Sequence, residues 1–282
     1  MGIQIMVDSG ADIMPEEATK LGVQVIPLRV AFGEEEYYDG ASIDHDTFFE
    51  KLIETDELPK TSQVSPGEYL DAFEACNEDE IICITISSKL SGCYQSATIA
   101  ASDTGKKVFV VDSLSAAIGE RLIVETAVRL RDKGCSVAEI ANTLAQKRKE
   151  VKVIALLDTL EYLKKGGRIS AAAAAAGSVL SIKPVLSIVD GEITVIGKAR
   201  GSKMGNNRLI EFVKLSGGID FSQPFCLAYS GLSRAVLDKY IEDSRSLYEM
   251  EPDKLPVSSI GAAIGTHVGP GVVALAFFGG SI

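Results

Sequence analysis

A hydroxyl group and a glycine stand together where a buried strand is predicted to end. Residues 80–87 are rich in β-branched side chains, as buried parallel strands are, and the loop after them leads to Ser91 and Gly92 at the start of a predicted helix, 91–102. A helix start offers free N–H groups and the positive end of the helix dipole. The sequence therefore predicts an anion site here. Spacing alone leaves open whether Ser91 binds the anion or caps the helix.

The two histidines have very different surroundings. His267 lies between Gly265 and Gly269, where glycine lets the backbone approach a ligand closely. We expect His267 beside tight turns, where an imidazole can donate to a carboxylate or serve as a base. The glycines at 261, 265 and 269 recur every four residues, which favours helix packing over a phosphate loop. His45 lies between two aspartates, and we expect it to be solvated.

Arginine and hydroxyl residues mark further candidate positions. Arg168 follows two glycines and precedes Ser170, which can cap a helix beginning in the six alanines 171–176. A guanidinium there could pair with an anion through two hydrogen bonds, although a lone arginine is more often a surface residue. Thr61 and Ser62 begin a hydroxyl-rich turn before Pro66, where helix capping is the favoured interpretation. We expect capping as well from the polar residues after two other strands: Asp8, Ser9, Asp112 and Ser113.

The elements that would position these residues change in kind near residue 150. Before it, strands at 2–7, 80–87 and 107–111 alternate with helices, which favours a parallel sheet. Residues 23–32 are also strand-like, with 34–38 as a hairpin partner, and 235–249 is a predicted helix. The second part contains the clearest hairpin, 184–198, because Asp190-Gly191 suits a two-residue turn.

Charge changes at the same place. The net charge of the 282-residue chain is −11, with −13 in residues 1–150 and +2 in residues 151–282. An acidic balance argues against a nucleic-acid partner, which needs a basic surface. The cations gather between Lys164 and Lys214, a segment that contains nine lysines and arginines but only three acidic residues. This segment, which includes Arg200, Lys203 and Arg208, could face an anion or a partner protein.

Several kinds of site and segment are missing from the sequence. It has no P-loop, no GxSxG and no GxGxxG after a strand. Five cysteines without CxxC spacing, and two histidines without a carboxylate at ligand spacing, predict no metal, and no resident cofactor is indicated. The longest nearly uncharged stretch, 169–182, is shorter than the ~20 residues of a membrane span. The N-terminus lacks signal-peptide features, so we expect a cytoplasmic protein without stable membrane insertion.

Taken together and in order, the motifs resemble those of the DegV family over the whole chain. They are Asp8-Ser9, Thr61-Ser62-Gln63, the segment 91–97, Asp112-Ser113, Gly166-Gly167-Arg168-Ile169, Ile182-Lys183-Pro184 and the segment 265–271. The resemblance implies a two-domain α/β fold. We expect an N-terminal domain, 1–150, with a mainly parallel sheet flanked by helices. We expect a C-terminal α/β domain, 151–282, with a mixed or antiparallel sheet.

The resemblance also implies a function. Members of the family bind a long-chain fatty acid in an apolar tunnel between the domains, and those characterised present its carboxylate to an ATP-dependent fatty acid kinase for acyl-phosphate formation. By the same resemblance the carboxylate would lie among Thr61, Ser62, Ser91, the amides beside Gly92, and His267. Arg168 and Arg200 fall in family motifs near the polar end. No catalytic residue of its own is implied.

Two other functions remain open on the residues alone. A serine hydrolase would use Ser91 as nucleophile and His267 as base, with an aspartate such as Asp8 orienting the base. A stand-alone small-molecule kinase is the third possibility, although the sequence has no phosphate loop and no evident carboxylate cluster for a metal.

Overall fold

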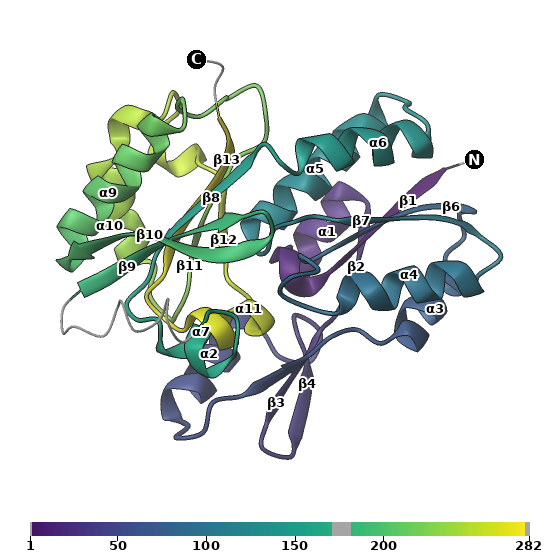
Figure 1. Ribbon diagram of the computed structural model, residues 1–282, viewed down its shortest axis with the longest axis horizontal. Helices are drawn as coiled ribbons and strands as arrows, with labels where there is room; N and C mark the ends of the chain where they lie inside the picture. Colours follow the sequence, from purple (N-terminus) through teal and green to yellow (C-terminus); the bar gives the residue numbers. More distant parts are fainter. Residues whose placement is uncertain (1, 171–181, 280–282) are drawn as a thin grey trace.

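The computed structural model describes residues 2–170 and 182–279, so the predicted alanine helix at 171–176 lies outside the described residues. Two large sheets lie side by side, each with its own helices (Figure 1). The first sheet has the order β2-β1-β6-β7 and all its neighbouring strands are parallel. Its strands are β1 (Ile3–Asp8), β2 (Val23–Ile26), β6 (Glu80–Thr85) and β7 (Lys107–Asp112).

Helices cover both faces of the first sheet. On one face, buried side chains of α1 (Pro15–Leu21), α5 (Ile118–Asp132) and α6 (Val137–Lys147) pack in one apolar cluster with the strands. On the other face α3 (Pro66–Ala75) and α4 (Cys93–Asp103) contribute to a second cluster, which extends away from the sheet to α2 (His45–Glu54) beside α7 (Glu161–Lys165) and α11 (Ala262–Val268) (Figure 1). The predicted parallel sheet flanked by helices is confirmed.

The second sheet has six strands in the order β10-β9-β8-β13-β11-β12. Only β11 and β12 run parallel, and the other neighbours are antiparallel, so the predicted mixed sheet is confirmed. The predicted hairpin is the pair β9–β10 and turns at Asp190-Gly191. The strands are β8 (Val151–Leu156), β9 (Ile182–Val189), β10 (Glu192–Arg200), β11 (Cys226–Tyr229), β12 (Val257–Ser259) and β13 (Val273–Phe278).

The two faces of this sheet have different neighbours. One face carries α9 (Gly201–Leu215) and α10 (Ala235–Asp243) over a core that includes Leu156 and Val185. Alternate residues of the same strands, such as Ala155 and Leu186, point the other way and join the cluster that contains α5. The second sheet is therefore packed on both sides, and its inner face meets the first half of the chain. The predicted helix 235–249 is shorter than expected and is followed by the 3-10 turn η2 (Arg245–Leu247).

The predicted single strand at 23–32 is wrong. β2 ends at Ile26, and the chain resumes as β3 (Arg29–Phe32) in a separate three-stranded sheet with β4 (Glu35–Tyr38) and β5 (Lys60–Ser62). Pro27 lies at the break and has no N–H to donate to a strand partner. This small sheet places Thr61 and Ser62 in a strand instead of the expected turn.

A short helix near the C-terminus was not predicted. α11 (Ala262–Val268) follows β12, and His267 lies in its last turn, not among tight turns as expected. The glycine series does serve helix packing, as predicted. A Cβ added at Gly265 would lie 2.6 Å from Cε1 of Phe48 in α2. Gly269, with φ +70°, ends the helix against Tyr162 of α7 (Glu161–Lys165).

Of the four polar residues expected to cap helices after two other strands, Asp8 does so, since its side chain accepts from the N–H of Gly10 in η1 (Ser9–Ala11). Ser9 donates to Asp39, Asp112 accepts from the N–H groups of Ser88 and Leu114, and Ser113 accepts from the N–H of Ser115. In the hydroxyl-rich segment after Thr61, Ser65 caps α3. No helix among the described residues is long and apolar enough to cross a membrane.

The close approach at Gly265 gives a stability prediction with a matched control. We expect Gly265→Ala to lower the free energy of unfolding by about 1–3 kcal/mol, because the new methyl group must displace Phe48. Gly67→Ala in α3 meets no heavy atom within 4 Å and gains up to ~1 kcal/mol of helix propensity. Denaturant unfolding measures both. Equal stability of the two variants would contradict the packing described here.

Candidate functional site

A pocket lies between the inner face of the second sheet and the first half of the chain. It contains about 980 Å³ of empty space, a volume that includes solvent outside its mouth. Leucine, isoleucine, valine and alanine supply most of its wall. Both halves contribute, for example through Ile86 and Ile118 on one side and Leu186 and Ile193 on the other.

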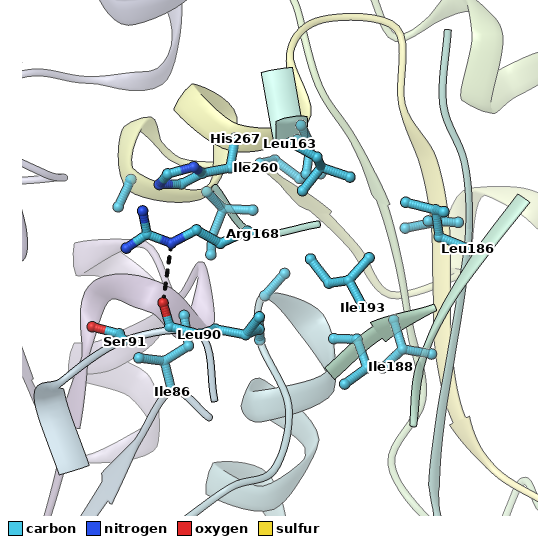
Figure 2. A pocket seen from close by; sticks show the side chains of 18 of the residues that line it. Ile86, Leu90, Ser91, Leu163, Arg168, Leu186, Ile188, Ile193, Ile260 and His267 are labelled. Carbon is cyan, nitrogen blue, oxygen red and sulfur yellow. Dashed lines mark hydrogen bonds between the residues drawn. The ribbon is translucent and has the colours of Figure 1, made fainter. Parts of the chain in front are cut away.

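Polar side chains gather at one end of this pocket. Figure 2 shows Ser91, Arg168 and His267 close together at that end, with Leu186, Ile188 and Ile193 at the opposite end. Thr61 joins the polar group through its contact with His267. The polar residues of the lining are Thr61, Ser62, Gln63, Ser91, Arg168 and His267, together with Ser187, which stands on β9 between Leu186 and Ile188. The structure thus brings five of the predicted site residues to one pocket: Thr61, Ser62, Ser91, Arg168 and His267.

His267 joins the two halves of the chain at the polar end. Its Nε2 lies 2.8 Å from Oγ1 of Thr61 in β5. Its Nδ1 is buried and has no hydrogen-bond partner among the described residues. Gly166 passes so close that a Cβ there would lie 2.2 Å from Nδ1. Burial, and next the charge of Arg168, lower the pKa of His267 to about 4, so the imidazole is neutral at pH 7.

Arg168 is fixed by backbone carbonyls from both halves. Its Nε donates to the carbonyl of Leu90 (3.1 Å) and one terminal nitrogen donates to the carbonyl of Gly166 (2.7 Å). The side chain is half-buried and lines the pocket. These bonds hold a positive charge beside Ser91, so the alternative of an ordinary surface arginine does not describe Arg168.

Ser91 and Gly92 have different tasks in the loop before α4. Gly92, not Ser91, is the N-cap residue of α4, so the capping interpretation of Ser91 is wrong. The Ser91 hydroxyl contacts Sγ of Cys93 at 3.2 Å and faces the pocket. Gly92 is outside the pocket lining, and a Cβ there would lie 1.9 Å from Oε1 of Gln63. Glycine at 92 therefore lets Gln63 pass along the loop.

Arg200 does not lie at the pocket. It is exposed at the end of β10 and is absent from the lining, and Lys203 and Arg208 lie on the following helix α9. A role for Arg200 near a ligand head group therefore stays a prediction from the resemblance. Arg168 is the member of the basic segment that reaches the polar end.

The arrangement needed by a serine hydrolase is not assembled among the described residues. The hydrogen-bond partner of His267 is Thr61, and the hydroxyl of Ser91 turns to Cys93. Asp8 accepts from the N–H groups of Ile86 (2.9 Å) and Gly10 (3.0 Å), so it does not orient the histidine. Burial raises the pKa of Asp8 to about 7. In the part of the chain that the structure describes, no group of acidic, cysteine and histidine side chains could hold a metal.

The expectation that His45 is solvated is wrong. Its Nδ1 lies 2.8 Å from the carbonyl oxygen of Ile260 and its Nε2 lies 3.0 Å from that of Gly231. The sequence also did not single out Asp12 and Asp39, which are buried although they belong to the acidic half. The sequence indicated Gln63 only as part of a motif and gave it no role of its own, yet it lines the pocket and donates to Ser96 (2.7 Å).

Comparison with known proteins agrees with this geometry. The family model described as "Uncharacterised protein, DegV family" matches residues 2–279. The chain belongs to the DegV family. A DegV domain-containing protein of Caldanaerobacter subterraneus is 34% identical over 281 residues, 98% of each chain. Another, from Clostridium perfringens, is 32% identical over 282 residues, 97% of each chain.

Solved structures of DegV proteins have the same fold. A fatty-acid-binding DegV protein of Thermus thermophilus has a TM-score of 0.85 at 31% identity, covering 99% of this chain and 100% of that one. DegV of Bacillus subtilis, described as a fatty acid binding protein, has a TM-score of 0.85 at 29% identity over 98% of each chain. The Streptococcus pneumoniae Fatty Acid Kinase B3 protein, loaded with linoleic acid, has a TM-score of 0.86 at 25% identity over 99% of each chain.

The buried state of His267 gives a titration prediction. Histidine-selective NMR of ligand-free protein should show His267 half-protonated near pH 4, well below its ordinary value of 6.5. Arg168→Ala should raise this midpoint because it removes a neighbouring positive charge, whereas Arg168→Lys, which keeps the charge, should change it less. A midpoint near 6.5 in the unmodified protein would contradict the burial described here.

The sign of the stability effect follows from the same shift. Between pH 6.5 and about 4 the unfolded chain binds a proton at His267 that the folded chain does not, so this contribution to stability falls as the pH falls. Asp8 acts in the opposite direction between 3.8 and about 7, because its folded form holds the proton. Ring titration is therefore a cleaner measurement than thermal unfolding.

Proposed function

We propose that this protein binds a long-chain fatty acid in the pocket and presents its carboxylate to an ATP-dependent fatty acid kinase. The kinase would transfer a phosphoryl group from ATP to a carboxylate oxygen, giving an acyl phosphate. The observation that carries the proposal is the one-sided polarity of the pocket: apolar walls along most of its surface and an arginine, a histidine and hydroxyl groups at one end. A fatty acid has the same distribution of polarity.

The energetics favour this occupant. Burying ~15 methylene groups at ~0.8 kcal/mol each gives roughly 12 kcal/mol of gross driving force. A hydrogen bond to a charged group contributes ~1.5–3 kcal/mol. The acyl chain therefore supplies most of the affinity, and the polar end orients the ligand.

The polar residues have complementary roles in the proposed complex. Arg168 supplies the positive charge that a carboxylate needs away from bulk water. Ser91 and Thr61 supply hydroxyl donors, and the neutral imidazole of His267 can donate from one ring nitrogen. Ser62 and the amides beside Gly92 are assigned to this end on the resemblance. No cofactor of its own enters the proposal.

The relatives support the ligand class and suggest the partner. DegV proteins of Thermus thermophilus and Bacillus subtilis are described as fatty acid binding, and the Streptococcus pneumoniae homologue is a fatty acid kinase component. We extend both properties to this chain. We also propose that residues 1–150 and 151–282 act as two domains with the ligand between them, which the two sheets and their shared pocket support. We also propose a cytoplasmic location, where ATP is available to the kinase.

A test compares a fatty acid with its methyl ester, which lacks the charge. The protein should purify with bound fatty acid, and after delipidation it should bind the acid saturably. We expect Ser91→Ala and His267→Ala each to raise the Kd of the acid by about 10- to 100-fold while leaving that of the ester nearly unchanged. Both variants should support acyl-phosphate formation poorly. Isothermal calorimetry and a coupled ATP assay measure the two quantities.

The matched control is Ser88→Ala, which removes an exposed hydroxyl from the same loop outside the pocket lining. It should bind and support phosphorylation like the unmodified protein. Delipidated protein without saturable fatty acid binding would refute the proposal. So would unchanged phosphorylation rates in both Ser91→Ala and His267→Ala at saturating kinase and ligand.

Two exposed lysines next to residues that line the pocket predict where the kinase docks. Lys60 precedes Thr61 in β5 and Lys164 lies on α7 shortly before Arg168, and both are exposed. Positive charge there would attract an acidic kinase surface and accommodate the incoming phosphoryl charge. Reversing both lysines to glutamate should lower the kinase-dependent rate roughly ten-fold at low ionic strength and less at high salt, with the fatty acid Kd unchanged.

Two other charge reversals locate the surface. The pair Lys133→Glu and Lys149→Glu makes the same change of charge at exposed positions just after α5 and α6 and should have no effect. The pair Lys203→Glu and Arg208→Glu tests α9, where the basic segment continues. Loss of rate in the α9 pair alone would move the docking surface away from the rim of the pocket.

A further inference from the structure

α11 belongs to the second half of the chain by sequence but is held by the first half. It contacts α2, β3, β5 and η1, in addition to α7. The contact with α2 is close, because only glycine at 265 leaves room for Phe48 and Phe49. The position of α11 is therefore set by residues far away in the sequence.

Two buried carboxylates bind the start of this helix. Oδ1 of Asp12 accepts from the N–H of Gly261 (2.8 Å), and Oδ1 of Asp39 accepts from the N–H of Ala262 (2.8 Å). Asp12 is 2% exposed and Asp39 is 5% exposed. A Cβ on Gly261 would lie 3.1 Å and 3.0 Å from these two oxygens. The carboxylates thus take N–H groups that a helix leaves unpaired at its start, and they clasp the backbone tightly.

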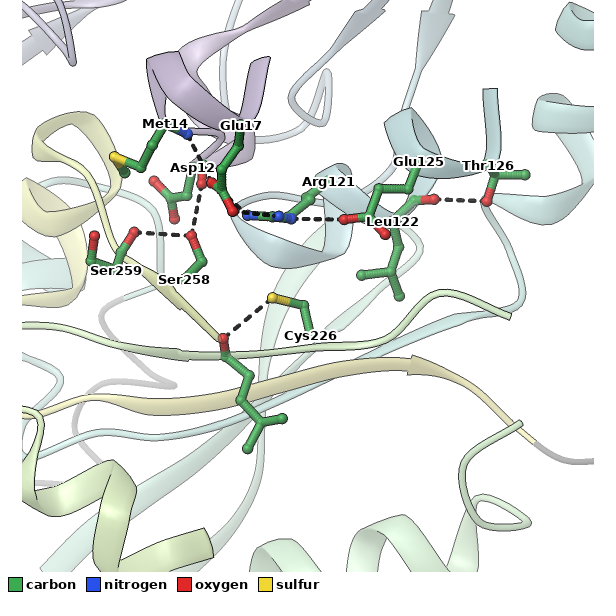
Figure 3. Close-up of polar contacts among 11 residues, drawn as sticks. Asp12, Met14, Glu17, Arg121, Leu122, Glu125, Thr126, Cys226, Ser258 and Ser259 are labelled. Atoms are coloured by element: carbon green, nitrogen blue, oxygen red, sulfur yellow. Dashed lines mark hydrogen bonds and ion pairs between the residues drawn. The ribbon is translucent and has the colours of Figure 1, made fainter. Parts of the chain in front are cut away.

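The carboxylate of Asp39 and the backbone of Asp12 are themselves bound by hydroxyl groups. Oδ2 of Asp39 accepts from the hydroxyl of Ser9 (2.9 Å), and that hydroxyl accepts from the N–H of Leu28 (3.0 Å). The backbone carbonyl of Asp12 accepts from the hydroxyl of Ser258 (2.9 Å), a contact drawn in Figure 3. Figure 3 also shows the ion pairs of buried Arg121: the pair with Glu17 joins α5 to α1 close to Asp12, and the pair with Glu125 lies within α5.

His45 binds Ile260, the residue before the two N–H groups that Asp12 and Asp39 bind. Its Nδ1 lies 2.8 Å from the carbonyl oxygen of Ile260, and its ring packs against Phe49 with 4.8 Å between centroids. Backbone groups of Ile260, Gly261 and Ala262 are therefore bound in succession by side chains of the first half.

The other end of α11 carries His267. Seven residues span about 10 Å of helix, so a displacement at the start is transmitted to the last turn. We propose that Asp12 and Asp39 are positioning residues: by binding the start of α11 they fix its orientation and so set the contact between His267 and Thr61 at the polar end of the pocket. The ligand consequence rests on the proposed function, whereas the geometry of His267 does not.

The alternative is that the two carboxylates only stabilise the fold. Asp39→Ala removes both carboxylate oxygens of Asp39. Asp39→Asn keeps an oxygen for the N–H of Ala262, and its amide nitrogen can donate to the hydroxyl oxygen of Ser9. The chain has two histidines: His45 binds Ile260 just before α11, and His267 lies in the last turn of α11. Histidine-selective NMR therefore reports separately on the two ends of this helix. In ligand-free Asp39→Ala we expect the His267 ring signals to move and its titration midpoint to rise by at least one pH unit from about 4, since the ring leaves its buried place. Asp39→Asn should restore the original midpoint.

A control separates positioning from stability. Ser244→Ala removes a buried hydroxyl that donates to the carbonyl of Tyr240, on the side of α10. It should lower the unfolding temperature without moving the His267 signals. Should Asp39→Ala fail to fold, Ser9→Ala removes the support of Asp39 more gently and should shift the same signals in the same direction.

The outcomes distinguish this inference from the proposed function. Unmoved His267 signals in folded Asp39→Ala and Ser9→Ala, with only lower unfolding temperatures, would overturn the positioning role. If the signals move and the Kd of the fatty acid rises about ten-fold while that of its methyl ester does not, positioning and ligand role both hold. If the signals move and fatty acid binding is absent in every form of the protein, positioning stands and the proposed function fails.

Discussion

A charged head group can be held at the end of an apolar pocket only when every polar group there is fixed before the ligand arrives. An unpaired charge or a loose polar group away from water costs more than an ordinary hydrogen bond returns. In this protein Arg168 is held by two carbonyls and His267 by Thr61. The Arg168–Leu90 and His267–Thr61 bonds cross from one half of the chain to the other. The Arg168–Gly166 bond lies within the second half, but Gly166 packs against His267. The geometry of the polar end therefore depends on how the two halves of the chain pack together.

Close approach of the backbone at a few positions makes this packing possible. Glycine at 166 admits the ring of His267, and glycine at 92 admits Gln63. Ala117 lines the pocket with φ +54°, a conformation that favours glycine, and its N–H donates to the carbonyl of Gly10 at 2.7 Å. Backbone of this kind costs roughly 1–3 kcal/mol and persists where the surroundings over-determine it. The wall of the pocket is therefore shaped by the backbone as well as by side chains.

Local patterns predicted much of this structure, since strand and helix periods and turn residues act over a few positions. The parallel strands and the Asp190-Gly191 hairpin were predictable for this reason. The break at Pro27 was readable in principle, because proline cannot donate within a strand. α11 and β12 were missed because they are short and take their stability from distant partners such as Asp39 and Phe48. His45 was misjudged for a related reason: its acidic neighbours in sequence face water, while its ring reaches carbonyls more than 180 residues away.

The site residues show the same division. Ser91, Arg168 and His267 were found through glycine neighbours and resemblance, but their mutual geometry decides between functions. A general base works best when its pKa lies near the working pH, and a nucleophilic serine must reach it. His267 has a pKa of about 4 and is bound to Thr61, while Ser91 turns to Cys93. A neutral imidazole beside a fixed guanidinium is suited to holding a carboxylate, and poorly suited to removing a proton from serine. The arrangement therefore favours a carrier whose chemistry is completed by a partner over a hydrolase that acts alone.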